Sequence, residues 1–187
     1  MEFQFVPQSI PSVILVVHDM FRDQRGFFAE VFREEEFLRG GLPRFVQDNH
    51  SRSAQDVLRG LHYQINPAPV GKLVRCLKGA IWDVAVDIRK GSPTYGKHVG
   101  IELSEGDSKM LYVPAGFAHG FVTLSDGAEV FYKMTGYHSG AHDRAVRWND
   151  PALDIPWPVR EPTLSEKDAR APLLAEADNN FTWPAGA

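Results

Sequence analysis

Short segments rich in β-branched and aromatic residues follow one another along most of this chain, and they constrain its fold more than any other feature. Glycine, proline, aspartate and serine separate them, as is typical of short strands joined by turns. Many short strands at this spacing favour an all-β jelly-roll barrel over an alternating α/β sheet. The expected strands are residues 13–17, 27–32, 57–64, 72–77, 81–88, 98–103, 110–114, 117–124 and 128–134.

Two segments interrupt this pattern with helical features. Residues 33–41 begin with charges and end in two glycines, and residues 165–177 begin with Ser165, a good N-cap, followed three positions later by Asp168. The Pro- and Trp-rich residues 148–162 predict an ordered connection around the barrel. We therefore expect short peripheral helices, including one near the C-terminus.

The totals limit the possible function classes. A chain of 187 residues predicts one domain, 1–187, and its net charge of −4 argues against nucleic-acid binding. No apolar run is long enough to span a membrane. Cys76 is the only cysteine, which fits a reducing compartment, so we expect a cytoplasmic protein.

Residues 81–88 read as a strand with two unlike faces. Period two places Asp83 and Asp87 on one face with Ile81 and Ala85. That face looks either into a water-filled cavity or into bulk solvent, and burial costs alone do not choose between them.

A metal site lacks ligands in this sequence. A jelly-roll barrel often holds a metal through a His-x-His pair, but Gln64 follows His62 at that spacing, and Lys72 stands where an acidic ligand would help. A lysine ammonium has no lone pair to donate. We expect no bound metal.

Acid–base chemistry fits the residues better. His62, Lys72, His119 and Tyr132 all fall on expected strands, and together they suit proton removal beside a carbonyl with return of a proton from the other face. Taken singly, each is more often a satisfied polar group of the core or surface, and only the whole set favours catalysis. Asp168 could cap the last helix, or it could orient His62.

Phosphate binding would depend on side chains. Arg25, Arg59 and Lys167 could neutralise a diphosphate, since the sequence has no glycine-rich phosphate loop.

Several short motifs follow one another along the chain in a specific order. They are DQRGFFAEVF at 23–32, QDNHSRS at 47–53, VLRGLHYQ at 57–64, GKLVRCLKG at 71–79, WDVAVDIRKGSPTYG at 82–96, PAGFAHGFVTLS at 114–125, YKMTGY at 132–137, WNDP at 148–151 and SEKDARAPLL at 165–174. Taken in order, these motifs resemble the dTDP-4-dehydrorhamnose 3,5-epimerase family of metal-free cupins, which act on nucleotide-linked 4-keto-6-deoxy sugars. The resemblance runs from about residue 10 to 175, and implies a cupin-type jelly roll that works without a cofactor.

The resemblance implies a role for each catalytic candidate. His62 is similar to the family's general base, and Asp168 to the carboxylate paired with it. Lys72 would stabilise the enolate oxygen, and Tyr132 would return a proton to the opposite face.

The resemblance also implies the substrate contacts and a homodimer. Arg59 and His119 would lie near the diphosphate and sugar. Further contacts are implied for Gln47, Asp48, Asn49, His138, Asp143 and Lys167, while Arg25 and Glu30 would reach the nucleotide from the neighbouring subunit.

The sequence leaves two questions open: how Arg59 and His62 are arranged, and which nucleotide is bound. Strict alternation puts Arg59 and His62 on opposite faces of a strand, whereas the resemblance has both meet one substrate. We therefore expect a bulge or twist at Gly60, or Arg59 at the mouth of the pocket. His138 stands where the family has a tyrosine that stacks on thymine, and Asp143 where it has a glutamate, which leaves the nucleotide open.

The sequence therefore predicts an epimerase that inverts C3 and C5 of dTDP-4-dehydro-6-deoxy-D-glucose, giving dTDP-4-dehydro-L-rhamnose. Inversion of one carbon only, or action on another nucleotide, is the alternative, and a 3,4-ketoisomerase is more distant. From other classes, a metal-dependent cupin oxygenase and a non-catalytic sugar-nucleotide binding module remain open.

Overall fold

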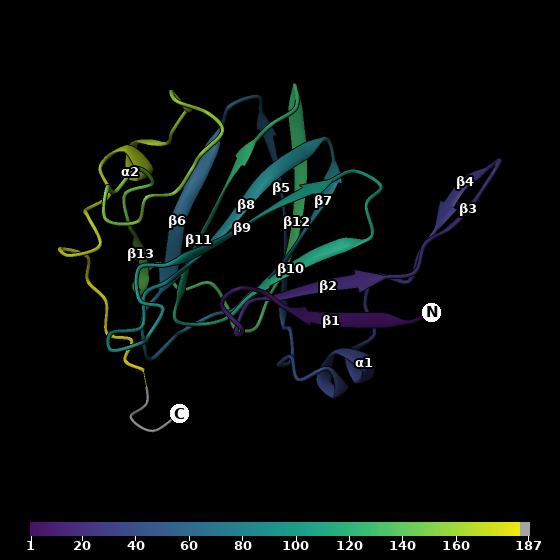
Figure 1. Ribbon diagram of the computed structural model, residues 1–187, viewed down its shortest axis with the longest axis horizontal. Helices are drawn as coiled ribbons and strands as arrows, with labels where there is room; N and C mark the ends of the chain where they lie inside the picture. Colours follow the sequence, from purple (N-terminus) through teal and green to yellow (C-terminus); the bar gives the residue numbers. More distant parts are fainter. Residues whose placement is uncertain (184–187) are drawn as a thin grey trace.

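Two antiparallel sheets face each other in the computed structural model, which describes residues 1–183 (Figure 1). The last four positions of the expected domain lie outside the described residues. In spatial order, the six-stranded sheet contains β1 (Phe3–Pro7), β2 (Ile14–His18), β10 (Lys109–Val113), β7 (Lys72–Lys78), β12 (Gly127–Met134) and β5 (Gln47–Ala54). The five-stranded sheet contains β13 (Asp143–Ala145), β6 (Leu58–Gln64), β11 (Phe117–Thr123), β8 (Ala80–Asp87) and β9 (His98–Ser104). This arrangement confirms the predicted jelly roll.

The main core fills the space between the sheets. Apolar side chains from both sheets meet there, among them Val74, Ala85, Leu111 and Val130, all fully buried. Period-two alternation explains this, because every second side chain of a strand points to the same face.

Both outer faces are covered. The five-stranded sheet carries Val84, Val86 and Ile88 on its outside, where Leu153 and Trp157 from the expected connection pack over them. On the six-stranded sheet, the short helix α1 (Glu34–Arg39) brings Phe37 against β1, β2 and β10. Each sheet is therefore buried on two sides at these positions.

The open question about residues 81–88 is answered by burial. Asp83 and Asp87 are both 0% exposed, and the apolar residues of their face, Ile81 and Ala85, belong to the core between the sheets. This face looks into the barrel and not into bulk solvent.

Several expected boundaries were wrong. The helix expected over 165–177 is only α2 (Glu166–Ala169), because Pro172 disfavours helical backbone at the residue before it. The strand expected over 27–32 ends at Phe28. The strands β1, β5 and β13 were not expected, nor was β3 (Phe21–Asp23).

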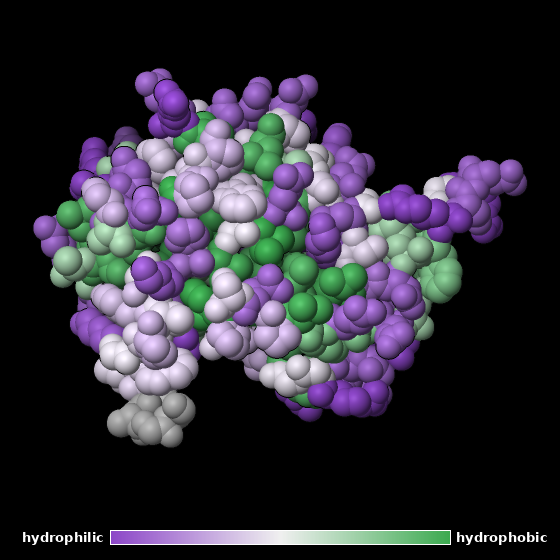
Figure 2. All heavy atoms as spheres, viewed as in Figure 1, coloured by the Kyte–Doolittle hydropathy of each residue, from purple (hydrophilic) through white to green (hydrophobic). Residues whose placement is uncertain are grey.

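A two-stranded hairpin, β3 with β4 (Gly26–Phe28), stands away from the body of the molecule (Figures 1 and 2). Its phenyl rings are exposed: Phe21 by 58%, Phe27 by 54% and Phe28 by 67%. Three exposed phenyls on one arm are unusual for a surface that meets only water.

Within the described residues, no helix is long and apolar enough to cross a membrane.

Candidate active site

The strand β6 is deformed at Gly60, as the position of Arg59 and His62 requires. On the neighbouring strand β11, Arg59 pairs with Phe121 and His62 pairs with His119. The two residues are three positions apart on β6 but their partners are only two apart on β11, so β6 contains one extra residue. Gly60 has φ +142°, and a Cβ there would lie 2.5 Å from the Cα of Gly120. The bulge confirms the expectation and lets Arg59 and His62 line one cavity.

His62 is paired with a carboxylate from the other end of the chain. Its Nε2 lies 2.5 Å from Oδ1 of Asp168, whose side chain is only 3% exposed. Burial alone would raise the pKa of Asp168, but the hydrogen bond and charge of His62 hold that pKa below its ordinary value. An Asp168 carboxylate makes Nε2 the protonated nitrogen, so Nδ1 carries the free lone pair.

Of the two roles that the sequence left open, the Asp168 side chain has the second, next to His62, and Ser165 provides the cap. The Ser165 hydroxyl accepts a hydrogen bond from the Asp168 backbone N–H at 3.1 Å, so Ser165 caps α2. The Asp168 carboxylate instead reaches His62, and the backbone N–H of Gly60 also stabilises its charged form. The cap therefore fixes the backbone of the residue whose side chain orients His62.

His62, Lys72 and Tyr132 line both of two connected hollows. The outer one has a volume of about 400 Å³ and the inner one about 200 Å³. The other residues of the outer hollow are Gln47, Asn49, Tyr63, Gln64, Val70, Met134, His138, Asp143 and Lys167, and those of the inner hollow are Ser51, Arg59, His119 and Phe121.

Burial shifts the acidities of the two further candidates in useful directions. It lowers the pKa of Lys72 to about 8, although Asp143 and Asp83 oppose the shift. It raises the pKa of Tyr132, so the phenol keeps its proton at neutral pH. The Lys72 ammonium lies 5.9 Å from the centre of the Tyr132 ring. A cation and a proton donor thus stand beside His62.

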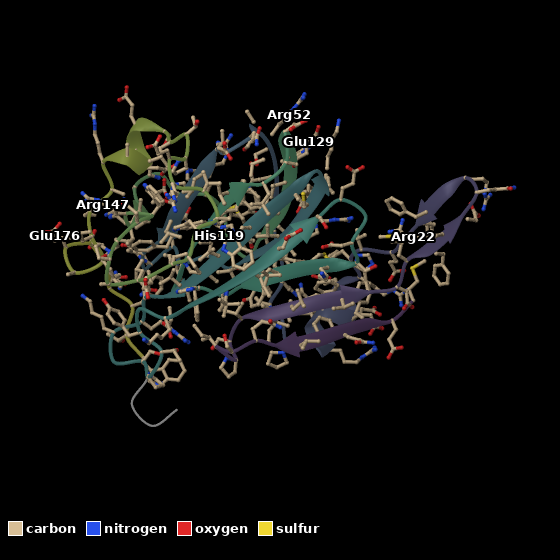
Figure 3. All side chains as sticks on the ribbon, turned by 45° about the horizontal axis from the view of Figure 1, so that its top comes forward. Arg22, Arg52, His119, Glu129, Arg147 and Glu176 are labelled. Atoms are coloured by element: carbon tan, nitrogen blue, oxygen red, sulfur yellow. The ribbon has the colours of Figure 1, made fainter. Side chains whose placement is uncertain are left out.

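A second histidine–carboxylate pair lies next to the first. His119 is the cross-strand partner of His62, and its Nε2 lies 2.8 Å from Oδ1 of Asp83. Figure 3 shows His119 among the strands in the body of the molecule. Burial lowers the pKa of His119, and the charges of Lys72 and His62 lower it further.

The outer hollow is bounded by polar contacts. Lys167 donates a hydrogen bond to Asp143, and the His138 backbone N–H donates to Oε1 of Gln47 at 2.9 Å. Asn49 lies beside them, two residues along β5 from Gln47. These polar groups could bind the nucleotide end of a ligand.

Three expected contacts do not line the two hollows. The Asp48 carboxylate accepts from Lys133 at 2.9 Å on the other face of β5. Arg25 lies in the hairpin turn with its side chain 85% exposed and paired with Asp23, and Glu30 pairs with Arg33 at 2.7 Å. Within one chain, Arg25 and Glu30 therefore do not meet His62.

The sequence reasoning missed several lining residues that period two could have found. Ser51, Gln64, Phe121 and Met134 each stand two positions after a candidate that was named: Asn49, His62, His119 and Tyr132. The pairing of Asp83 with His119 had no local signal. Among residues 1–183, no three histidine, cysteine, aspartate or glutamate side chains are grouped so that they could hold a metal ion.

Comparison with known proteins gives one consistent match. The family model described as dTDP-4-dehydrorhamnose 3,5-epimerase matches residues 7–176. The dTDP-4-dehydrorhamnose 3,5-epimerase of Pseudomonas aeruginosa is 53% identical over 173 residues, which are 91% of this chain and 95% of that protein.

Solved structures agree with the sequence match. The dTDP-6-deoxy-D-glucose-3,5-epimerase of Legionella pneumophila, in complex with dTDP-4-keto-L-rhamnose, has 42% identity and a TM-score of 0.94, covering 98% of this chain and 100% of that one. A 3′-monoepimerase from Streptomyces bikiniensis, in complex with dTDP-quinovose, has 35% identity and a TM-score of 0.85, covering 90% and 87%.

Proposed function

Because this chain belongs to the dTDP-4-dehydrorhamnose 3,5-epimerase family, we propose that His62, Lys72 and Tyr132 carry out the family's reaction in the two connected hollows. The activity is that of a 3,5-epimerase acting on dTDP-linked 4-keto-6-deoxy sugars. This answers the question that His138 and Asp143 raised about the nucleotide. The observation that carries the mechanism is the convergence of a His–Asp pair, an ammonium and a phenol on one cavity.

The first step is proton removal by His62. C3 and C5 both adjoin the C4 ketone, so their protons are acidic enough for an imidazole. Nδ1 of His62 takes the proton, and Asp168 stabilises the imidazolium through Nε2. The electrons of the C–H bond pass to the ketone oxygen as an enolate, which the Lys72 ammonium stabilises.

The second step returns a proton from the opposite side. Tyr132 lies on β12 of the six-stranded sheet and His62 on β6 of the five-stranded sheet, so the two residues face the cavity from opposite walls. A phenol with a raised pKa stays protonated until the enolate carbon takes its proton. The configuration at that carbon is inverted, and solvent restores both side chains.

The two hollows suit the two ends of the substrate. We place the nucleotide against Gln47, Asn49 and His138 in the outer hollow, with Lys167 near its diphosphate. The sugar then occupies the space between His62 and the inner hollow, near Arg59 and His119.

We also propose that the protein works as a homodimer. The hairpin β3–β4 presents three exposed phenyls and the exposed Arg25 away from its own cavity. A second copy would cover the phenyl rings and receive Arg25 and Glu30 at its nucleotide end. In that arrangement the dimer completes each site.

Solvent exchange tests this mechanism. The protein is incubated in deuterated water with dTDP-4-keto-6-deoxyglucose, and NMR locates the incorporated deuterium. We expect label at C3 and C5, abolished by His62→Ala. Tyr132→Phe should still exchange a proton but invert poorly. Label at one carbon would make the enzyme a mono-epimerase, and exchange that survives His62→Ala would refute the assignment of the base.

A further inference from the structure

Asp83 is a buried carboxylate that the mechanism above does not use. It lies on β8, is 0% exposed, and accepts one hydrogen bond, from Nε2 of His119 at 2.8 Å. Its second oxygen, Oδ2, is buried without a hydrogen-bond partner among the described residues. A half-satisfied buried carboxylate destabilises a fold, so its presence needs a reason.

The other buried carboxylate of β8 shows what a purely structural aspartate looks like. Asp87 accepts from Arg89 at 2.7 Å and 2.8 Å, from Ser92 at 2.6 Å and from Thr94 at 2.7 Å. Its oxygens are fully occupied in tying a loop to the barrel. Among the described residues, the Asp83 carboxylate is hydrogen-bonded to the ring of His119 alone.

The Asp83 contact determines which nitrogen of His119 carries the proton. A carboxylate can only accept, so Nε2 of His119 must be the protonated nitrogen. His119 stays neutral because it is buried beside Lys72 and His62, which oppose a further positive charge. Its other nitrogen, Nδ1, therefore holds a lone pair, and the ring lines the inner hollow.

A lone pair in that position selects its ligand. It repels a phosphate oxygen, which also offers only lone pairs, and it accepts a hydrogen bond from a hydroxyl group. His119 therefore cannot bind a phosphate oxygen as the cations of the site, Arg59 and Lys72, can. The inner hollow is thus built to bind a hydroxyl-bearing ring.

We propose that Asp83 is a positioning residue that fixes His119 as a hydrogen-bond acceptor for a hydroxyl group of the sugar. This deepens the proposed function, on which it rests. It predicts that the sugar, and not the diphosphate, contacts His119.

Nitrogen-15 NMR of the histidine rings tests the proposal without any turnover. In the wild-type protein at neutral pH, the His119 signals, assigned by their loss in His119→Gln, should show a protonated Nε2 and an unprotonated Nδ1. A protonated Nδ1, or an imidazolium, would overturn the proposal even if the enzyme were a fully active epimerase.

Ligand titration on the same signals identifies the contacting group. An unreactive dTDP-6-deoxyglucose without the ketone should shift Nδ1 of His119, whereas dTDP alone should not. Equal shifts with both ligands would assign His119 to the diphosphate and refute the sugar contact. Failure of the proposed function would instead appear as no deuterium exchange by the wild-type enzyme.

Asp83→Asn tests the role of Asp83 itself on the same signals. The amide keeps the shape of the side chain but can donate as well as accept, so it no longer requires a proton on Nε2 of His119. A population of His119 with a protonated Nδ1 should then appear, and the shift of Nδ1 on adding dTDP-6-deoxyglucose should weaken. The matched control is Asp87→Asn, which removes a buried carboxylate from the same strand and should leave the His119 signals in place. Unchanged His119 signals in Asp83→Asn would refute the role of Asp83. If Asp83→Asn does not fold, the two measurements on the wild-type protein still decide the proposal.

Discussion

Nε2 of His62 lies 2.5 Å from Oδ1 of Asp168, although 106 positions separate the two residues in the chain. His62 comes from the interior of the five-stranded sheet and Asp168 from a single turn of helix packed against β6. The pair directs Nδ1 of His62 to the cavity. Proton removal in the proposed mechanism depends on this contact.

Asp168→Asn should reduce kcat by about 100-fold or more, because the amide can neither fix the protonated Nε2 nor stabilise the imidazolium. Substrate binding should change little. Ser165→Ala is the control, since it removes the cap on the Asp168 backbone and leaves the carboxylate. Single-turnover kinetics measure both variants, and a near-normal rate for Asp168→Asn would remove the dyad from the mechanism.

The activity should fall at alkaline pH because the pKa of Lys72 is lowered to about 8 by burial. Only the protonated amine stabilises an enolate, so kcat/KM should decline as the pH rises through that value. The raised pKa of Tyr132 places loss of its proton at higher pH. Initial rates from pH 6 to 10 check this, and a rate that still rises at pH 9.5 would contradict the assignment. Lys72→Met should be slow at every pH.

Mixed dimers test whether the hairpin serves the partner's site. His62→Ala and Arg25→Ala should each be nearly inactive alone. Randomly re-associated at equal concentration, half of the dimers are mixed and each has one intact site, so about a quarter of the wild-type activity should return. Arg39→Ala, which alters an exposed arginine of α1, is the control for Arg25→Ala. No recovery in mixtures that sediment as dimers would place Arg25 outside the site.

Gly60→Ala should destabilise the protein by roughly 2 kcal/mol or more, because a Cβ would meet the backbone of Gly120 and the φ of +142° is strained for alanine. Activity should fall with it, since the bulge directs His62. Gly140→Ala is the matched control, because a Cβ there meets nothing within 4 Å. Urea unfolding compares them, and equal stability would mean that the bulge tolerates a side chain.

The layered fold and the kinds of side chain available for chemistry could be predicted from the sequence alone. Period-two alternation predicted which side chains of 81–88 share a face, because a strand's side chains point to opposite faces whatever its partners are. It did not predict which of the two faces looks into the barrel. A bulge or twist at Gly60 was one of two ways in which Arg59 and His62 could meet one substrate, and the structure has the bulge, where a side chain would not fit.

Some local structure escaped the sequence because partners impose it. The strand β5, with the polar sequence QDNHSRSA, has no apolar pattern and is extended because all eight of its residues pair with β12. Residues 170–177 were expected to be helical but are not. Pro172 disfavours helical backbone before it, and Leu174 packs on the outer face of the five-stranded sheet.

Which charged groups meet depends on how distant parts of the chain pack together. Nothing near His119 in the sequence points to Asp83, because sheet pairing brings the two together. The pairing of His62 with Asp168 was implied only by the family resemblance, since no spacing in the sequence selects it. Their protonation follows from the same packing: removal of water lowers the pKa of Lys72 and raises that of Tyr132. The sequence supplies the acids and bases, and burial sets their strengths.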